Sequence, residues 1–426
     1  MQQDIYQAYI DILKEELVPA MGCTEPIAIA YASSKAKQVL DEEVSSVVVT
    51  ASNNIIKNVK SVIVPNTGSL RGIKAAAIAG IVAGDADKEL QVLSNVTQQQ
   101  IELMKDSLDK IKCKVKAADD HYVFYIGVEV IGANHKAFVE VIGSHTNIVK
   151  IVKDDEILFQ KDILEEKDSH KVDHNLLKVK DIVEFADEVD ISDVKEVLDR
   201  QIECNTTIAN EGLKNDWGAN IGSILLSSYG NSVHNKAKAY AAAGSDARMS
   251  GCELAVVINS GSGNQGLTAS LPVIVYANEL KASRESLYRA LVVSNLVTIH
   301  LKTGIGPLSA YCGATSAGAG AGAGITYLYG GKYDEIAHTI VNALAINSGM
   351  ICDGAKPSCA AKIASAVEAG LLGMQMQSHD SQFYDGEGIV VKGVENTINN
   401  VSRIAHDGMK QTDSLIIKLM TDNVNK

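Results

Sequence analysis

Two hydrophobic patterns divide the chain near residue 170. Before that point, segments with helical spacing of apolar residues alternate with β-branched runs. Helices are predicted at residues 2–19, 24–40 and 72–84. Strands are predicted where β-branched residues cluster or alternate: 44–51, 59–64, 121–131, 135–142 and 148–159. We therefore expect a mixed α/β domain over residues 1–170.

After about residue 175 the apolar residues lie on several faces of each predicted helix, as in helices that are buried all round. This region is rich in Ala, Gly and Ser, whose small side chains let helix backbones approach closely. It predicts an all-α domain over residues 171–426. The charged segment 161–174 has no apolar period and is either a linker or a solvated loop within one domain. The expected fold class is α+β, with an N-terminal mixed α/β domain followed by a larger all-α domain.

The acidic balance of the chain narrows the classes of function. Asp and Glu outnumber Lys and Arg by 52 to 39, which gives a net charge of −13. Nucleic-acid binding is not expected, because phosphate contacts need clustered Lys and Arg. The apolar tract 311–329 is mostly Gly and Ala, so a membrane span is not expected either. The N-terminal segment carries Asp4 and Glu15 and lacks a basic start, which indicates a cytoplasmic protein without a signal peptide.

Three of the seven cysteines lie in segments that predict turns. Cys352 and Cys359 belong to SGMICDGAKPSC, and Cys312 stands beside Gly313. The odd cysteine count and the large chain argue against disulfides. Three thiolates on such loops fit a [4Fe–4S] cluster with one open iron site, which could bind substrate as a Lewis acid. Buried cysteines without a ligand role are the alternative, and zinc is a poor fit without a CxxC pair.

A glycine-rich loop follows the apolar run at 254–259. Its candidate substrate-binding residues are Ser260, Gly261, Ser262, Gly263, Asn264 and Gln265. The loop matches the dinucleotide pattern GxGxxG, but no βαβ alternation surrounds it and Pro272 follows too early for a long dinucleotide-binding helix. Free backbone NH groups before a helix can instead hold a carboxylate. A plain loop is the alternative.

Cys23 is the candidate catalytic residue. It lies in MGCTEP, directly before a predicted helix, where the helix dipole and free NH groups would stabilise a thiolate that acts as a base. The neighbouring carboxylate of Glu25 would oppose this, and a buried structural cysteine is the alternative. His145, at a strand end, is a second candidate base, although such a histidine is more often structural.

Three further residues are weaker candidates for binding substrate. Asn66 and Thr67 form a polar turn before a helix. Arg248, in SDARMSG, could clamp a carboxylate or form an ordinary salt bridge.

Taken in this order, MGCTEP, VPNTG, SDARMSG, INSGSGNQG and the three cysteines resemble the L-cysteine desulfidase and serine dehydratase α-chain-like (UPF0597) family. The resemblance covers essentially the whole chain. It implies a [4Fe–4S] cluster held by Cys312, Cys352 and Cys359, a substrate carboxylate held by the glycine-rich loop, and proton transfer by Cys23. It also implies that the all-α domain is the catalytic one.

The expected reaction is a β-elimination, without pyridoxal phosphate (PLP), that converts L-cysteine to pyruvate, ammonia and hydrogen sulfide. No lysine stands in a recognisable pyridoxal motif. A soft iron site suits a thiolate leaving group, which favours cysteine over serine. The alternatives are an L-serine dehydratase and a non-catalytic iron–sulfur or amino-acid-binding protein. The expected partners are a small amino-acid substrate and a second copy of the chain in a homodimer.

Overall fold

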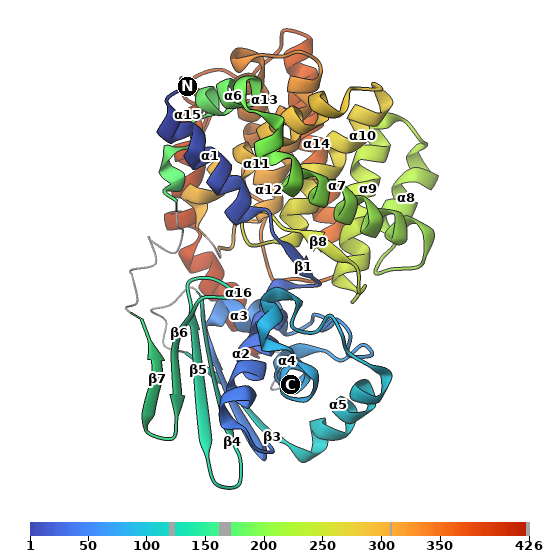
Figure 1. Cartoon of the computed structure of the whole chain (residues 1–426). Helices are drawn as coiled ribbons and strands as arrows, with labels where there is room; N and C mark the ends of the chain where they lie inside the picture. The colour runs from blue at the N-terminus through green and yellow to red at the C-terminus, as the bar shows by residue number, and fades with distance from the viewer. Residues whose placement is uncertain (119–123, 162–171, 307–308, 423–426) are drawn as a thin grey trace.

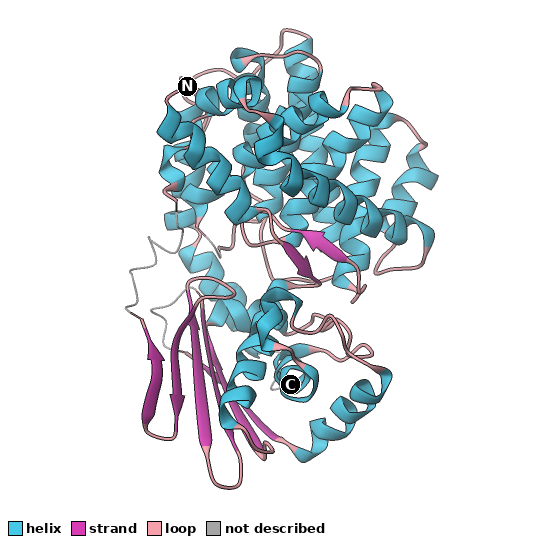
Figure 2. Ribbon diagram, in the orientation of Figure 1, coloured by secondary structure: helices cyan, strands magenta, loops and turns pink. Residues whose placement is uncertain are grey.

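The computed structural model describes residues 1–118, 124–161, 172–306 and 309–422. Its strands gather at one end of the molecule and helices fill the other (Figure 2). This arrangement confirms the expected α+β class. Most of the predicted linker, residues 162–171, lies outside the described part of the chain.

Six of the described strands form one sheet in the order β3-β2-β4-β5-β6-β7. They are β2 (Ser46–Ala51), β3 (Lys112–Ala117), β4 (Tyr125–Ile131), β5 (Lys136–Ile142), β6 (Ile148–Lys153) and β7 (Glu156–Gln160). β2 and β3 run parallel, and every other neighbouring pair is antiparallel. Alternate residues of β2 are buried, because successive side chains of a strand point to opposite faces.

Helices pack against this sheet (Figure 1). They and the short 3₁₀ helix beside them are α2 (Thr24–Leu40), α3 (Asn53–Val59), α4 (Gly72–Ala83), α5 (Gln98–Lys110) and η1 (Ala86–Gln91). α2 contacts β4 and β5, and α4 lies against α2. The predicted helices at 24–40 and 72–84 are therefore present.

Two strand predictions are wrong in detail. The run at 59–64 is not a strand: α3 ends at Val59, and beyond it the backbone folds back in a tight loop with a single bridge between Ile63 and Arg71. The run at 148–159 is two strands rather than one. They are joined by a turn at Asp154, whose φ of 54° is left-handed.

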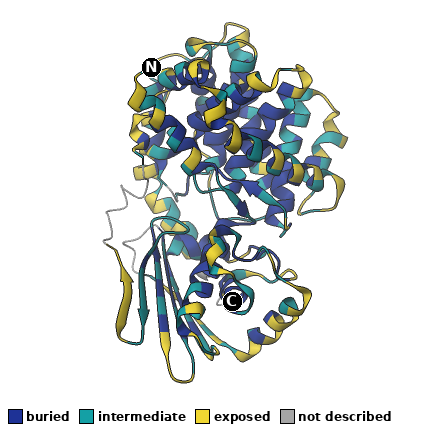
Figure 3. Cartoon of the chain, viewed as in Figure 1, coloured by how far each residue is buried: buried dark blue, intermediate teal, exposed yellow. Residues whose placement is uncertain are grey.

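The rest of the described chain is almost entirely helical. Its elements are α6 (Val179–Glu188), α7 (Ile191–Lys214), α8 (Ile221–Tyr229), α9 (Val233–Met249), α10 (Gly263–Glu279), α11 (Arg284–Ile305), α12 (Gly313–Leu328), α13 (Tyr333–Ile346), α14 (Cys359–Ser378), α15 (Val394–Arg403) and α16 (Lys410–Asp422), with short turns η3 (His174–Leu176) and η4 (Ile404–Gly408). Figure 3 shows that the buried residues concentrate where these helices meet.

The Gly- and Ala-rich helix α12 lies at the centre of this bundle, against α10, α11, α13 and α14. A Cβ at Gly318 would lie 2.2 Å from the carbonyl oxygen of Ala366, and one at Gly322 would lie 2.6 Å from that of Gly370. Only glycine permits such close helix contacts. Among the described residues, no helix combines the length and the apolar character that crossing a bilayer requires.

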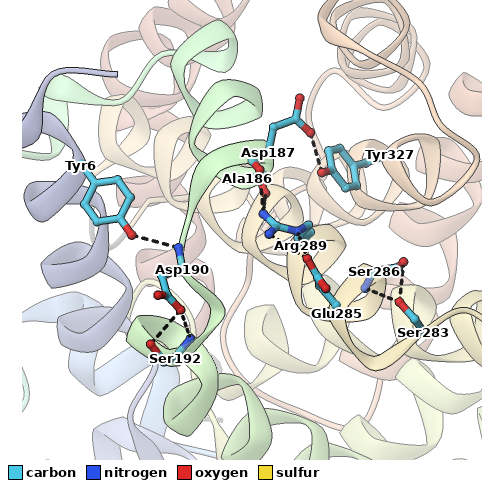
Figure 4. Close-up of polar contacts among 10 residues, drawn as sticks. All are labelled: Tyr6, Ala186, Asp187, Asp190, Ser192, Ser283, Glu285, Ser286, Arg289 and Tyr327. Carbon is cyan, nitrogen blue, oxygen red and sulfur yellow. Dashed lines mark hydrogen bonds and ion pairs between the residues drawn. The ribbon is translucent and has the colours of Figure 1, made fainter.

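The first helix, α1 (Gln3–Glu16), packs on the helical part although it precedes the sheet. The Tyr6 hydroxyl donates to Asp193. It also accepts from the backbone NH of Asp190, as Figure 4 shows. The N-terminal amine pairs with Glu184 and Glu188. α1 therefore belongs spatially with the helical bundle.

Several contacts join the helical part to the segments beside the sheet, among them a strand pair and an ion pair. β1 (Pro19–Met21) pairs antiparallel with β8 (Ala255–Val257), a ribbon at the centre of Figure 1. At the other end of the chain, α16 returns to α3, where Lys57 and Asp413 form an ion pair of 2.5 Å. The chain thus crosses between the two parts more than once.

Candidate active site

A cavity of about 1870 Å³ lies between the two parts of the molecule. Most of the residues singled out from the sequence line it: Cys23, Arg248, Ser260, Gly261, Ser262, Asn264, Gln265, Cys312, Cys352 and Cys359. Gly263 is not among the lining residues and packs against Arg248, because a Cβ at Gly263 would lie 2.4 Å from Arg248 Nε. The β1–β8 ribbon accounts for part of this convergence, because it leads into Cys23 on one strand and into the glycine-rich loop on the other.

The loops that carry Cys312 and Cys352 are held together by backbone hydrogen bonds. The NH of Cys312 donates to Met350 O at 2.8 Å, and the NH of Cys352 donates to Ala310 O at 2.6 Å. Cys312 directly precedes α12, and Cys359 is the first residue of α14. Two of the three thiols therefore lie at the positive ends of two adjacent helices, where a negative charge is stabilised.

The electrostatic surroundings favour negative charge on Cys352 alone. The hydrogen bond to Cys352 and burial raise the pKa of Cys312 well above its usual value, and burial raises the pKa of Cys359. A hydrogen bond from Cys312 lowers the pKa of Cys352 to about 6, with help from the positive charges of Lys57 and Lys362. Burial lowers the pKa of Lys302 to about 8, and the nearby Cys352 and Cys312 oppose this shift. The lysines place compensating positive charge around the three thiols.

Three cysteine thiols that face one cavity are a donor set that fits an iron–sulfur cluster. Among the residues that the structure describes, no three His, Cys, Asp or Glu side chains lie close enough together to share one ion. Yet Cys312 hydrogen-bonds to Cys352, and all three cysteines face one cavity. A cluster holds its thiolates further apart than one ion does, because the iron–sulfide core lies between them. Thiols without histidine or carboxylate partners are also the ligands that such clusters use.

Cys23 lies at the start of α2, as expected, but its surroundings do not favour a thiolate. Its Sγ is buried and donates to Glu25 Oε2 at 2.9 Å. Burial and the Glu25 carboxylate raise the pKa of Cys23 well above its usual value. They outweigh the helix dipole, so the residue is a protonated thiol at neutral pH. Cys23 packs near Cys359, which brings the two ends of the chain to one site.

The glycine-rich loop and Arg248 form a further part of the cavity wall. Ser260 and Gly261 adopt φ values of 50° and 74°, and this left-handed turn leads into the first NH groups of α10. The Arg248 side chain is buried and donates from Nη1 to Asn264 Oδ1 at 3.1 Å. Its Nε has no hydrogen-bond partner among the described residues. A buried donor without a partner points to a ligand at this position.

The dinucleotide alternative lacks its structural context. β8 pairs only with β1, in a two-stranded antiparallel sheet, so no parallel βαβ unit surrounds the loop in the described residues. Pro272 lies inside α10.

Buried amide side chains, which sequence reasoning missed, hold this loop in place. Asn205 accepts from the NH of Val257 at 2.8 Å, and Asn259 donates to Asn295 Oδ1 at 3.0 Å. Asn295 in turn exchanges hydrogen bonds with Gln201. Amide side chains within otherwise apolar helical stretches could have indicated such a network. Their hydrogen-bond partners could not be predicted, because they are distant in sequence.

Asn66 and Thr67 are not among the residues that line the cavity. Asn66 donates to Leu93 O at 2.6 Å, and the Thr67 hydroxyl donates to Val64 O at 2.6 Å. Their side chains hold the turn together, and this favours a structural role over the predicted substrate contact.

His145 lines the cavity, although its position at a strand end suggested a structural role. Its ring packs edge-on against Phe124 with centroids 4.8 Å apart, and a Cβ at Gly261 would lie 3.4 Å from its Cε1. Nε2 is buried without a hydrogen-bond partner among the described residues. Burial lowers the pKa of His145, so the imidazole is neutral at neutral pH.

The chain was compared with known proteins. Residues 87–418 match the family described as serine dehydratase alpha chain. A UPF0597 protein of Desulfitobacterium hafniense is 57% identical and covers 98% of this chain and 97% of its own length. UPF0597 proteins of Lachnoclostridium phytofermentans and Finegoldia magna are 51% and 46% identical, and these matches cover 98% and 97% of this chain and 100% and 99% of those proteins. The match confirms the resemblance drawn from the motifs and indicates a lyase. The chain belongs to the serine dehydratase α-chain-like UPF0597 family.

Proposed function

We propose that the protein is an iron–sulfur lyase, independent of PLP, that β-eliminates L-cysteine to pyruvate, ammonia and hydrogen sulfide. The observation that carries the proposal is that three cysteines, a glycine-rich loop and a buried arginine face one cavity. The arrangement brings thiol ligands and a carboxylate site into the same cavity.

Cys312, Cys352 and Cys359 would hold the [4Fe–4S] cluster, which when bound supplies a Lewis-acidic iron with an open coordination position. The helix N-termini at Cys312 and Cys359 and the lysines around them would stabilise its negative charge. The substrate carboxylate would be bound by Arg248 and the first NH groups of α10.

In this proposal, His145 and Cys23 carry out the proton transfers. Neutral His145 removes the Cα proton, the electron pair forms the Cα–Cβ double bond, and the Cβ–S bond breaks with its electrons on sulfur. The Cys23 thiol donates a proton to the departing sulfide and is reprotonated from His145. Water then hydrolyses the aminoacrylate, through its imine, to pyruvate and ammonia. Cys23 thus keeps its predicted part in proton transfer, as the acid rather than the base.

The second candidate is L-serine dehydration, favoured by the family match to serine dehydratase alpha chain. The same residues would act, with hydroxide as the leaving group. A thiolate leaves more readily and suits a soft metal better, which places L-cysteine first.

The experiment is to reconstitute the protein anaerobically and to measure pyruvate and sulfide from each amino acid. We expect a higher kcat/KM for L-cysteine than for L-serine, with sulfide and pyruvate formed in equal amounts. A higher value for L-serine would reverse the ranking. Cluster absorbance without turnover of either substrate would instead support a binding protein.

The role of the three cysteines is tested separately. Cys352→Ala should lose both the visible cluster absorbance and the activity. Cys204, half-buried on α7 and not among the residues that line the cavity, provides the matched control. Cys204→Ala should retain both, and retention of the full cluster by Cys352→Ala would contradict the proposed ligand set.

A further inference from the structure

Glu25 presents a carboxylate to the cavity that no positive side chain neutralises directly. It lines the cavity and is partly exposed to it. Among the described residues, no Lys, Arg or His nitrogen lies within ion-pair distance of its oxygens. Although partial burial opposes ionisation, nearby His145, the Cys23 thiol and Arg248 hold the pKa of Glu25 below its usual value. A charged carboxylate in such a site normally has a cationic partner.

Neutral donors fix the position of this carboxylate. Oε2 accepts from Cys23 Sγ at 2.9 Å and from the Thr24 hydroxyl at 3.2 Å, and Oε1 accepts from Asn58 Nδ2 at 2.9 Å. Thr24 Oγ1 also lies 3.1 Å from Gly261 O, which ties Glu25 to the glycine-rich loop. A carboxylate held this firmly is oriented before any ligand arrives, and this lowers the entropic cost of binding.

Two side chains of opposite charge, Arg248 and Glu25, line the cavity without forming a direct ion pair. Arg248 is close enough to lower the pKa of Glu25, yet the two side chains form no ion pair of 4.0 Å or less. Arg248 instead bonds Asn264 and keeps Nε free of protein partners in the described structure. A positive and a negative side chain that line one cavity without pairing directly match the two charges of an amino-acid zwitterion.

We infer that Glu25 binds the α-ammonium group of the substrate and thereby restricts the site to free α-amino acids. This inference rests on the proposed function, because it assumes that Arg248 and the α10 N-terminus bind the α-carboxylate. It predicts that acids without an α-amino group, and N-acylated amino acids, are poor ligands. A ligand without an ammonium group would leave the Glu25 carboxylate without a cationic partner in the complex. Such a ligand should therefore bind more weakly than an amino acid.

The test compares two ligands that lack a leaving group at Cβ, L-alanine and propionate, by titration calorimetry on the anaerobic, cluster-loaded protein. They share a carboxylate and differ in the ammonium. The wild-type protein should bind L-alanine about 10- to 100-fold more tightly than propionate. Glu25→Gln should remove most of this preference and leave propionate binding unchanged or tighter.

Two further variants separate Glu25 from its surroundings. Glu15 also lines the cavity, and Glu15→Gln should keep the preference for L-alanine if the effect belongs to Glu25 rather than to overall charge. Glu25→Asp, which keeps the charge, should retain part of the preference even if Glu25→Gln is poorly folded by circular dichroism.

The outcomes distinguish this inference from the proposed function. Equal loss of preference in Glu25→Gln and Glu15→Gln, or an unchanged preference in Glu25→Gln, would overturn the role of Glu25 while the amino-acid site stands. If the wild-type protein binds neither ligand, the proposed carboxylate site fails as well.

Discussion

Burial moves the pKa values of His145 and Cys23 in opposite directions for the same physical reason. Burial penalises the charged form, so it lowers the pKa of His145 and raises that of Cys23. Two groups whose pKa values differ in this way can act as proton acceptor and proton donor at the same pH. The sequence placed Cys23 at a helix start correctly, but the carboxylate two residues on and the depth of burial decided its protonation state. A local sequence pattern does not reveal how deeply a side chain is buried.

The pH dependence of kcat/KM follows from these shifts. His145 must be neutral, so activity should rise with pH through a pKa below its ordinary value of 6.5. The Cys23 thiol must be protonated, so activity should fall only above the ordinary thiol value of 9.0. A flat profile between these limits is expected. Activity that rises as Cys23 ionises would restore the thiolate as the base.

Substitution of either residue separates chemistry from cluster binding. Cys23→Ser and His145→Gln should each lower kcat by about 10²-fold or more, because a positioned acid or base contributes that much. Cluster absorbance should stay at the wild-type level in both. Cys113→Ser is the control, since Cys113 lies on β3 away from the cavity lining. Full activity in His145→Gln would remove this residue from the mechanism.

At the scale of elements, α12 shows what a sequence can and cannot tell. Its Gly- and Ala-rich composition predicted a helix that packs closely, and the structure contains that helix. The bridge between Tyr311 and Ile351, which brings Cys312 beside Cys352, could not be predicted, because isolated pairings between distant loops leave no periodic trace. The strand β3 was missed for a related reason, since its alternate lysines resemble a solvated loop.

The close contact of α12 and α14 makes Gly318 sensitive to a single methyl group. Gly318→Ala places a Cβ 2.2 Å from a backbone carbonyl of α14, which cannot move independently of its helix. We expect a loss of about 1–3 kcal/mol in the free energy of unfolding, measured with urea. Gly244→Ala is the control, because its new Cβ would meet only the ends of the flexible Leu267 and Leu271 side chains, the nearest atom at 3.1 Å. An equal loss of unfolding free energy in Gly318→Ala and Gly244→Ala would show that α12 can shift to make room for the new methyl group.

At the scale of the whole molecule, the two parts are joined at the cavity by segments from both ends of the chain. The division into a sheet part and a helical part was predictable from the change in hydrophobic pattern. The position of α1 on the helical bundle was not, since an amphipathic helix gives no indication of which partner it covers. The homodimer stays a prediction.

The ion pair between Lys57 and Asp413 should decide whether α16 stays on α3. Lys57 is almost fully buried, so removing its carboxylate partner leaves a desolvated charge. Asp413→Asn should increase amide hydrogen exchange in α16 and leave exchange in α12 unchanged. Asp407→Asn, on the exposed turn before α16, should have no such effect. Unchanged exchange in the Asp413 variant would show that other contacts hold α16.

The meeting of Cys23 with Cys359 has a consequence for biosynthesis. During synthesis, MGCTEP leaves the ribosome more than 300 residues before Cys352 and Cys359. The proposed iron site would therefore be incomplete until these two cysteines have been added, and metal loading would follow their synthesis. In the same way, strand β1 has no pairing partner until the residues of β8 have been synthesised.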